Sequence, residues 1–107
     1  MFIIREVIIK VKILSSSSTT LLKLDNKKRL QINIKNNNII FLNIYTKKKN
    51  FIISNRKDIN DFLQKIDYCL NNCIDMDFKY NYNTVTFKYK EVIFICNTIF
   101  NLIKEDI

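Results

Sequence analysis

Glycine, proline and histidine are all absent from this chain of 107 residues. Without glycine, the chain has neither a phosphate-binding P-loop nor the tight turn that binds a dinucleotide. Without histidine, it lacks the side chain that most often acts as a general base near neutral pH. The usual set of nucleophile, base and stabilising group cannot be assembled, so we predict a protein that is not an enzyme and needs no cofactor.

The absence of glycine also decides which residues make the tight turns. A turn residue with positive φ must here be asparagine or aspartate, because these tolerate that conformation best after glycine. Asn36–Asn38 and Tyr80–Asn83 are therefore predicted turns. Lys, Asn and Ile dominate the composition instead. This bias is typical of an A+T-rich genome, such as that of a virus, an intracellular parasite or a low-GC bacterium.

Long apolar runs and an even number of cysteines are missing too. Arg5, Glu6, Lys10 and Lys12 interrupt the apolar N-terminus, so we expect no cleavable signal. No stretch approaches the ~20 apolar residues of a membrane span. The three cysteines cannot all pair. These features predict an intracellular protein, in the cytoplasm or nucleus, that is not secreted and has no membrane partner.

Acidic residues are scarce in the front half of the chain. Residues 1–56 carry twelve Lys or Arg against Glu6 and Asp25, whereas residues 57–107 carry six Lys against eight Asp or Glu. The whole formal net charge of +8 therefore comes from the front half. Such a basic segment indicates a polyanionic partner. An apolar content of 48% excludes a disordered basic tail.

The spacing of apolar residues predicts a single α+β domain over residues 1–107. We expect a curved antiparallel sheet of about six to seven strands with two helices, arranged as four strands and a helix followed by two strands and a helix. Ser15–Ser18 form a loop, and Asn55 caps a helix over 57–72. The predicted strands are 2–14, 19–25, 28–35, 39–46, 50–54, 75–81 and 84–90.

The C-terminal segment is apolar on nearly all sides. We predict a second helix there, over 91–104, with a strand over 92–96 as the alternative. A helix that is apolar all round must be buried, and in so small a chain this favours a second subunit. The residues predicted to form a homodimer interface are Ile95, Ile99, Phe100 and Ile103.

The two central strands, 28–35 and 39–46, alternate between two kinds of side chain. One face is apolar and is the predicted core. Its residues are Leu30, Ile32, Ile34, Ile40, Leu42 and Ile44. The other face interleaves cations, amides, aromatic rings and Ile39. Single-stranded nucleic acid is bound by such surfaces, because bases stack on aromatic rings while Lys and Arg follow the phosphates.

This second face, with the lysine cluster that follows it, is the candidate binding site for single-stranded DNA or RNA. The predicted contacts are Arg29, Gln31, Lys35, Phe41, Asn43, Tyr45, Lys47, Lys48 and Lys49. In a second interpretation, Phe41 and Tyr45 pack beneath another element and the lysines only solvate the protein. A rival function is a protein-interaction or scaffold module whose basic face binds an acidic partner.

The segment 19–72 resembles the PC4-like family of single-stranded-DNA-binding transcriptional coactivators. The resemblance lies in the basic strand Lys28–Ile34, in Leu42–Tyr45, in Lys47–Ser54 and in Phe62-Leu63 of the helix. It implies a homodimer joined largely through the helices, with single strands lying across the two sheets. The contacts it implies are Arg29, Lys35, Phe41, Tyr45 and Lys47–Lys49. Whirly-like and PUR-like proteins, with repeated units of strands and a helix, are a second comparison for the additional tail 75–104.

Carboxylates and cysteines suggest two weaker hypotheses. Asp75 and Asp77 are placed to hold Mg²⁺ as in a nuclease, but a third ligand is missing from the pattern. Cys69 and Cys73 lie at i, i+4, yet a zinc site needs four ligands and only Cys96 remains. We therefore predict no metal and expect all three cysteines to be buried as small hydrophobic side chains.

Overall fold

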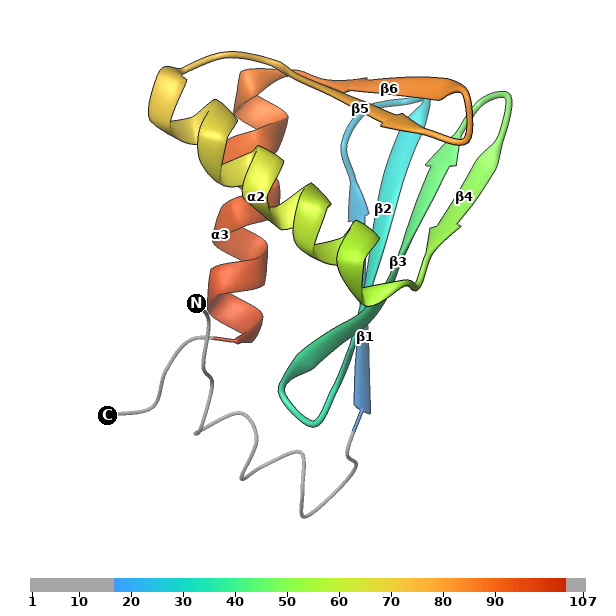
Figure 1. The fold of residues 1–107 in the computed structure, drawn as a ribbon, viewed down its shortest axis with the longest axis vertical. Coiled ribbons are helices and arrows are strands. Elements are labelled where there is room, and N and C mark those ends of the chain that lie inside the picture. The colour runs from blue at the N-terminus through green and yellow to red at the C-terminus, as the bar shows by residue number, and fades with distance from the viewer. Residues whose placement is uncertain (1–16, 104–107) are drawn as a thin grey trace.

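The computed structural model describes residues 17–103, and its fold is α+β. Within that range six strands and two helices follow in the predicted order (Figure 1). Their bounds are β1 Ser17–Lys23, β2 Lys28–Lys35, β3 Asn38–Thr46, β4 Asn50–Ile53, α2 Arg56–Asn72, β5 Met76–Tyr80, β6 Asn83–Phe87 and α3 Tyr89–Leu102. The predicted strand 2–14 lies outside the described residues. Neither described helix is long and apolar enough to cross a membrane.

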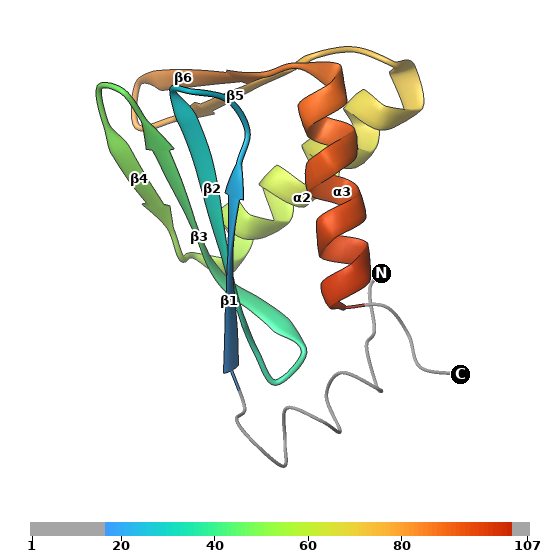
Figure 2. The same ribbon diagram turned by 180° about the vertical axis from the view of Figure 1, so that it is seen from behind.

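The strands form two antiparallel sheets instead of the single sheet of six or seven strands that we predicted. β1 to β4 pair in chain order as a meander, and β5 pairs with β6 as a separate hairpin. Figures 1 and 2 show this hairpin lying across one end of the larger sheet, with α2 and α3 together on one side of that sheet. The other face of the larger sheet is clear of both described helices.

Two predicted element boundaries are wrong. Ser17 and Ser18, expected in a loop, begin β1, where they pair with the end of β2. Tyr89, expected in the last strand, begins α3 instead. In the capping box at this point, the side chain of Glu91 accepts a hydrogen bond from the backbone N–H of Lys88 at 2.8 Å. That contact starts the helix directly after β6.

Asparagine replaces glycine at most positions of the two predicted turns, but the prediction that such residues must be asparagine or aspartate is wrong for Tyr82. Asn36 and Asn37 have φ values of 51° and 67°, and Asn81 and Tyr82 have 49° and 64°. Two consecutive residues with positive φ are what the tightest hairpin turns require. Cys73 ends α2 with φ of 54°, a left-handed position in which helices commonly place glycine.

The core lies between the larger sheet, the hairpin and the two helices. Phe62 of α2 is fully buried. Its ring centroid lies 5.0 Å from that of Phe78 and 6.0 Å from that of Phe87, and both pairs are edge to face. This arrangement is favourable for aromatic rings beyond the area they bury. The three rings attach α2 to both strands of the hairpin.

Most of the apolar surface of α3 is buried within its own chain. The exposed fractions of Ile95, Ile99 and Ile103 are 0%, 1% and 4%. These three predicted interface residues are therefore core residues, because the single chain already covers them. Phe100, the fourth, is 55% exposed. The predicted helix is confirmed, and the alternative of a strand over 92–96 is wrong.

A β-bulge changes which residues of β3 face the core. The register with β2 shifts between Asn33 and Ile34, so that Phe41 pairs with Asn33 and Ile39 with Ile34. Ile40, left between them, is 37% exposed, whereas Ile39 is 3% exposed. Simple alternation places these two isoleucines on the wrong faces, because the extra residue shifts the strand by one position.

Lys28 joins β2 to α3 and does not belong to the basic surface. Its Nζ donates hydrogen bonds to Oε1 of Glu91 and to the backbone carbonyl of Thr86, both at 2.7 Å. The same nitrogen lies 5.3 Å from the centre of the Phe87 ring. The side chains of Lys28 and Glu91 are only 13% and 6% exposed. This shielded ion pair holds the start of α3 against the larger sheet.

Candidate nucleic-acid interface

The face of the β1–β4 sheet that points away from the helices, here called the outer sheet face, carries five of the predicted contacts. They are Arg29, Gln31, Phe41, Asn43 and Tyr45. Arg29 pairs with Tyr45, and Gln31 with Asn43, across β2 and β3. The five alternate along the strands with buried core residues, because successive side chains of a strand point to opposite faces.

The ring of Tyr45 is held in place by two amide side chains. Its hydroxyl donates to Oε1 of Gln31 at 2.8 Å and accepts from Nδ2 of Asn43 at 3.0 Å. Because both partners lie one row farther along the sheet, the ring leans along the surface and does not stand out from it. A ring in this position can offer its face to solvent, and the face is the part on which a base stacks.

Two amide atoms on the outer sheet face have no hydrogen-bond partner in the described part of the chain. Oδ1 of Asn33 accepts from the hydroxyl of Thr19 at 2.8 Å, but Nδ2 of Asn33 is unpaired. Oδ1 of Asn43 is unpaired as well. Native structures seldom leave buried polar atoms unsatisfied, because each costs free energy. Both atoms are covered by the surrounding side chains, so a bound molecule cannot reach them directly.

Apolar side chains extend the outer sheet face at both edges. Leu21 on β1 pairs with Gln31, Ile52 on β4 pairs with Asn43, and the two are 55% and 58% exposed. Gln31 and Asn43 lie between them, so the two exposed apolar side chains border a polar row on either side. The sequence pattern did not single out these residues, because an apolar residue in a short strand resembles core. Alternation with the buried Leu22, Phe51 and Ile53 is the signal that distinguishes them.

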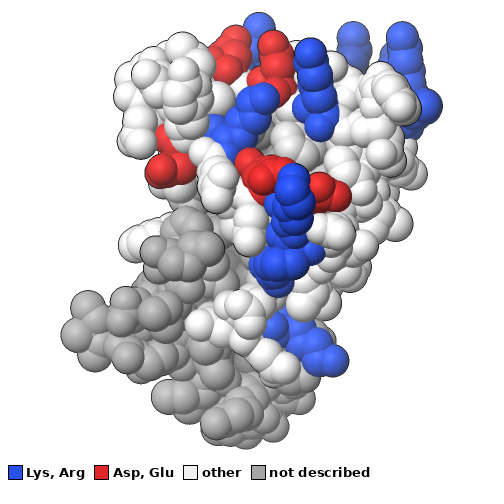
Figure 3. Space-filling view, viewed as in Figure 1, with Lys and Arg blue, Asp and Glu red and all other residues white. Residues whose placement is uncertain are grey.

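The predicted lysine cluster lies where β3 passes into β4. Lys47, Lys48 and Lys49 line a pocket of about 430 Å³, and the side chains of Lys48 and Lys49 are exposed. The hydroxyl of Thr46 accepts hydrogen bonds from the backbone N–H groups of Lys48 and Lys49 at 3.3 and 2.9 Å, which fixes the loop. Figure 3 shows basic side chains along the upper edge of the molecule over this loop, with acidic ones farther along the same edge.

This pocket, here called the lysine pocket, draws its residues from three separate segments. The loop between β1 and β2 supplies Lys27, the loop between β3 and β4 supplies Lys47–Lys49, and β6 supplies Thr84. Tyr45 on the outer sheet face is followed directly by Thr46, which also lines the pocket. Tyr45 and Thr46 point to opposite faces of β3, so the lysine pocket lies on the helix side at the end of the sheet, and the Lys47–Lys49 loop connects it to the outer sheet face.

Lys35 lies apart from the other predicted cations. It pairs with Asn38 beside the turn between β2 and β3, at the opposite end of the strand from Arg29. Lys35 lies six positions after Arg29 along the extended strand, a distance of about 20 Å. Lys23 on β1 is closer to the predicted site, since it pairs with Arg29 and is exposed. Lys23, and not Lys35, therefore lies beside Arg29 and Tyr45 on the outer sheet face.

The two carboxylates of the nuclease hypothesis make ordinary structural contacts. Oδ1 of Asp75 accepts from the backbone N–H of Tyr89, and Oδ1 of Asp77 accepts from the hydroxyl of Thr86, each at 2.7 Å. Among the described residues no group of three or more His, Cys, Asp or Glu side chains is placed to hold a metal ion.

The cysteines differ from one another in burial. Cys69 is buried, Cys96 is half-buried and Cys73 is exposed, so the prediction that all three are buried is wrong for Cys73. Burial raises the pKa of the Cys69 thiol above its ordinary value. Cys69 is therefore a neutral thiol near pH 7 and packs as a small hydrophobic side chain.

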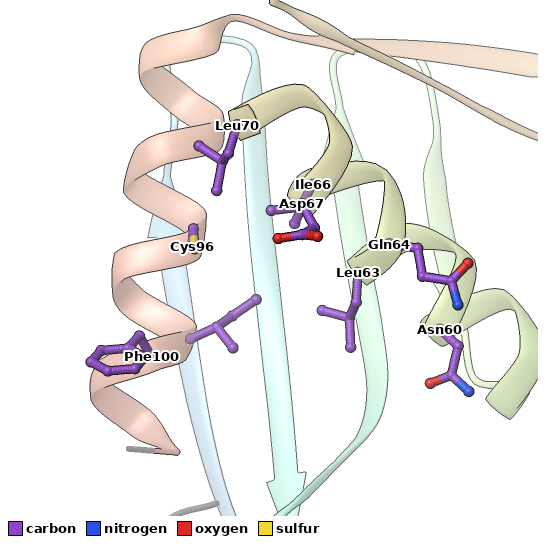
Figure 4. A pocket seen from close by; sticks show the side chains of 9 residues that line it. Asn60, Leu63, Gln64, Ile66, Asp67, Leu70, Cys96 and Phe100 are labelled. Carbon is purple, nitrogen blue, oxygen red and sulfur yellow. The ribbon is translucent and has the colours of Figure 1, made fainter. Parts of the chain in front are cut away.

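A second pocket, of about 590 Å³, lies between α2 and α3 and is here called the helix groove. Leu63 and Leu70 of α2 point toward α3 (Figure 4), and Phe100 lines the groove from α3. Asn60, Gln64 and Asp67 add polar groups from α2. The groove lies with the helices on one side of the larger sheet, away from the outer sheet face.

Comparison with known proteins identified no relative of this chain. A scan against protein-family models, a search of curated proteins and a search of solved structures each found no match. The resemblance of residues 19–72 to PC4-like proteins consequently stays a prediction that rests on the residues themselves.

Proposed function

We propose that this chain binds single-stranded nucleic acid without catalysing a reaction and serves as an accessory factor in transcription or replication. The observation that carries the proposal is the Lys47–Lys49 loop at the end of β3, which follows Tyr45 of the outer sheet face and lines the lysine pocket. Bases stack on Tyr45 and Phe41, and Lys47–Lys49 with Arg29 hold the phosphates.

The proposal is tested by fluorescence anisotropy with a labelled oligonucleotide at several salt concentrations. We expect a single strand to bind more tightly than a duplex of equal length, because only unpaired bases can reach the rings. Replacing Lys47, Lys48 and Lys49 with Gln should weaken binding to all sequences alike. The slope of the logarithm of the binding constant against the logarithm of the salt concentration should also become shallower by roughly 2. Each phosphate that a lysine neutralises on a single strand adds about 0.7 to the steepness of this slope.

A matched control separates the lysine pocket from net charge. Lys57, Lys65 and Lys90 do not line the pocket, so their replacement with Gln removes the same charge elsewhere. This control triple should leave the salt slope nearly unchanged. Equal slopes for the two triples, or equal affinity for single strand and duplex, would reduce the interaction to general charge attraction. Absence of any binding would favour the rival function, a scaffold whose basic face binds an acidic protein.

We further propose that two copies associate as a homodimer through the helix groove. Phe94 and Phe100 of α3 are 46% and 55% exposed, and Phe100 lines the groove, as do Leu63 and Leu70. An exposed phenylalanine at an apolar groove indicates a contact surface. A two-fold pair lets the same surface serve both copies, and it is the commonest assembly of identical chains.

Light scattering tests the dimer. Phe100→Asp should lower the mass from twice 12.9 kDa to 12.9 kDa while the circular dichroism spectrum is retained, because Phe100 is half exposed in the single chain. Ile99→Asp, one residue away, should instead unfold the protein, since it places a carboxylate in the core. A wild-type mass of 12.9 kDa at micromolar concentration would contradict the dimer.

A further inference from the structure

The lysine pocket has a wall that the strand pattern of 28–49 does not suggest. The β5–β6 hairpin lies across the end of the larger sheet in both ribbon views (Figures 1 and 2), and Asn83, Thr84 and Thr86 line the pocket from that hairpin. A single strand that leaves the outer sheet face at Tyr45 and turns round the end of β3 over Lys47–Lys49 therefore meets the hairpin. A pocket closed on that side fits the end of a strand better than its middle.

The charge inside the pocket is strongly positive. Lys27, Lys47, Lys48 and Lys49 line it, and of the lining residues Asp25 supplies the carboxylate. Lys28 also lines the pocket, but its charge is offset by Glu91. Four lysines other than Lys28 thus line the pocket together with one carboxylate.

Asp25 itself is already engaged. Its Oδ1 accepts from the backbone N–H of Lys27 at 2.6 Å, and its Oδ2 lies 3.6 Å from Nζ of Lys28. The Lys27 N–H, followed by the charge of Lys28, lowers the pKa of this carboxyl group below its ordinary value. Asp25 is therefore ionised at neutral pH and occupied by the protein. The four other ammonium groups are left to an anion with more than one charge.

A phosphomonoester matches this charge and these donors better than a phosphodiester. It carries about −1.5 to −2 at pH 7 and three strong acceptor oxygens, whereas a phosphodiester inside a strand carries a single negative charge. The hydroxyl of Thr84, which makes no hydrogen bond in the described part of the chain, adds a neutral donor on the hairpin side. We propose that the lysine pocket binds the terminal phosphate of a single strand whose bases stack on the outer sheet face, an inference that rests on the proposed function.

Three oligonucleotides of one sequence test the inference: one with hydroxyl groups at both ends, one with a 5′-phosphate and one with a 3′-phosphate. One of the phosphorylated forms should bind about fivefold to tenfold more tightly than the unphosphorylated form, because the extra charge pairs with two or three ammonium groups. In the variant with Lys47, Lys48 and Lys49 replaced by Gln, that ratio should fall to about one. In the control triple at Lys57, Lys65 and Lys90 it should persist.

The variant Asp25→Asn gives a test in the opposite direction. Asparagine keeps an oxygen that can accept from the Lys27 N–H but removes the negative charge from the pocket. It should increase the preference for the phosphorylated strand about twofold to fivefold over wild type, as expected for one charge interaction near the surface. A preference that stays the same or decreases would count against a phosphate in this pocket.

The outcomes separate this inference from the proposed function. If all three oligonucleotides bind equally well, the terminal-phosphate site is wrong while strand binding stands. If none binds, the proposed function fails. Amide NMR with a deoxynucleoside 5′-monophosphate and with inorganic phosphate then shows whether the lysine pocket binds a phosphate group. Saturable shifts at Lys47–Lys49 and Thr84 that vanish in the lysine variant would then support a free phosphate compound as ligand. An unchanged spectrum would overturn the site.

Discussion

Replacing both Phe41 and Tyr45 with alanine is expected to weaken binding of a single-stranded oligonucleotide about 30-fold or more. The loss of one base–ring stack costs about 1–3 kcal/mol, and the double variant loses two of them. Both rings are half-buried on the outer sheet face, so their removal should leave the fold in place. Anisotropy titration at fixed salt measures the affinity, and thermal unfolding of the same samples checks the fold.

Two controls define what that result means. Tyr45→Phe removes the hydrogen bonds to Gln31 and Asn43 but keeps the ring, so it should retain most of the affinity. Tyr68→Ala removes a ring that is 61% exposed on α2, away from the outer sheet face, and should have no effect on binding. Unchanged affinity in the double variant would place the bases elsewhere. Unfolding of the double variant would show that the two rings are structural.

Replacing Phe62 with alanine is expected to destabilise the fold by about 3–5 kcal/mol, the usual cost of truncating a buried phenylalanine. The side chain is fully buried and its ring contacts Phe78 and Phe87, so the variant loses apolar burial and leaves a cavity between α2 and the hairpin. For a domain of this size, we expect the midpoint of thermal unfolding to fall by roughly 12 °C or more. Urea denaturation measures the free energy directly.

The matched controls again lie in the same helix. Phe62→Leu keeps most of the buried volume and should cost clearly less than Phe62→Ala. Tyr68→Ala changes an exposed residue and should stay within about 0.5 kcal/mol of wild type. A Phe62→Ala variant as stable as Tyr68→Ala would contradict the packing of α2 against β5 and β6. The hairpin forms one wall of the lysine pocket, so Phe62→Ala should also weaken phosphate binding there.

The sequence predicts those parts of the fold that depend on neighbours along the chain. The N-cap at Asn55 is confirmed by its hydrogen bond to the Lys57 N–H. Both asparagine turns are confirmed by their positive φ values. Alternation along β2 correctly separates Leu30 and Ile32 from the exposed face. Each of these features depends on residues fewer than five positions apart, whose geometry the backbone itself restricts.

The candidate site was predicted only in part, and for the same reason. Period-two alternation places Arg29, Gln31 and Tyr45 on one face, since it needs only the strand itself. The register shift beside Ile34 depends on how β2 pairs with β3, so alternation alone misplaces Ile39 and Ile40. Lys35 lies far from the lysine pocket because it is at the opposite end of β2 from Arg29, and alternation does not show which end of a strand lies near the pocket.

By itself, then, the sequence determined the α+β class, the order of strands and helices, and the concentration of positive charge in the front half. Tertiary structure decided which charges are exposed and which apolar residues are covered. Lys28 and Glu91 are 63 positions apart, yet their ion pair removes one lysine from the basic surface. The burial of Ile95 and Ile99, and the closing of the lysine pocket by β6, likewise need segments from both halves of the chain. Such contacts depend on packing between distant segments, which no local pattern encodes.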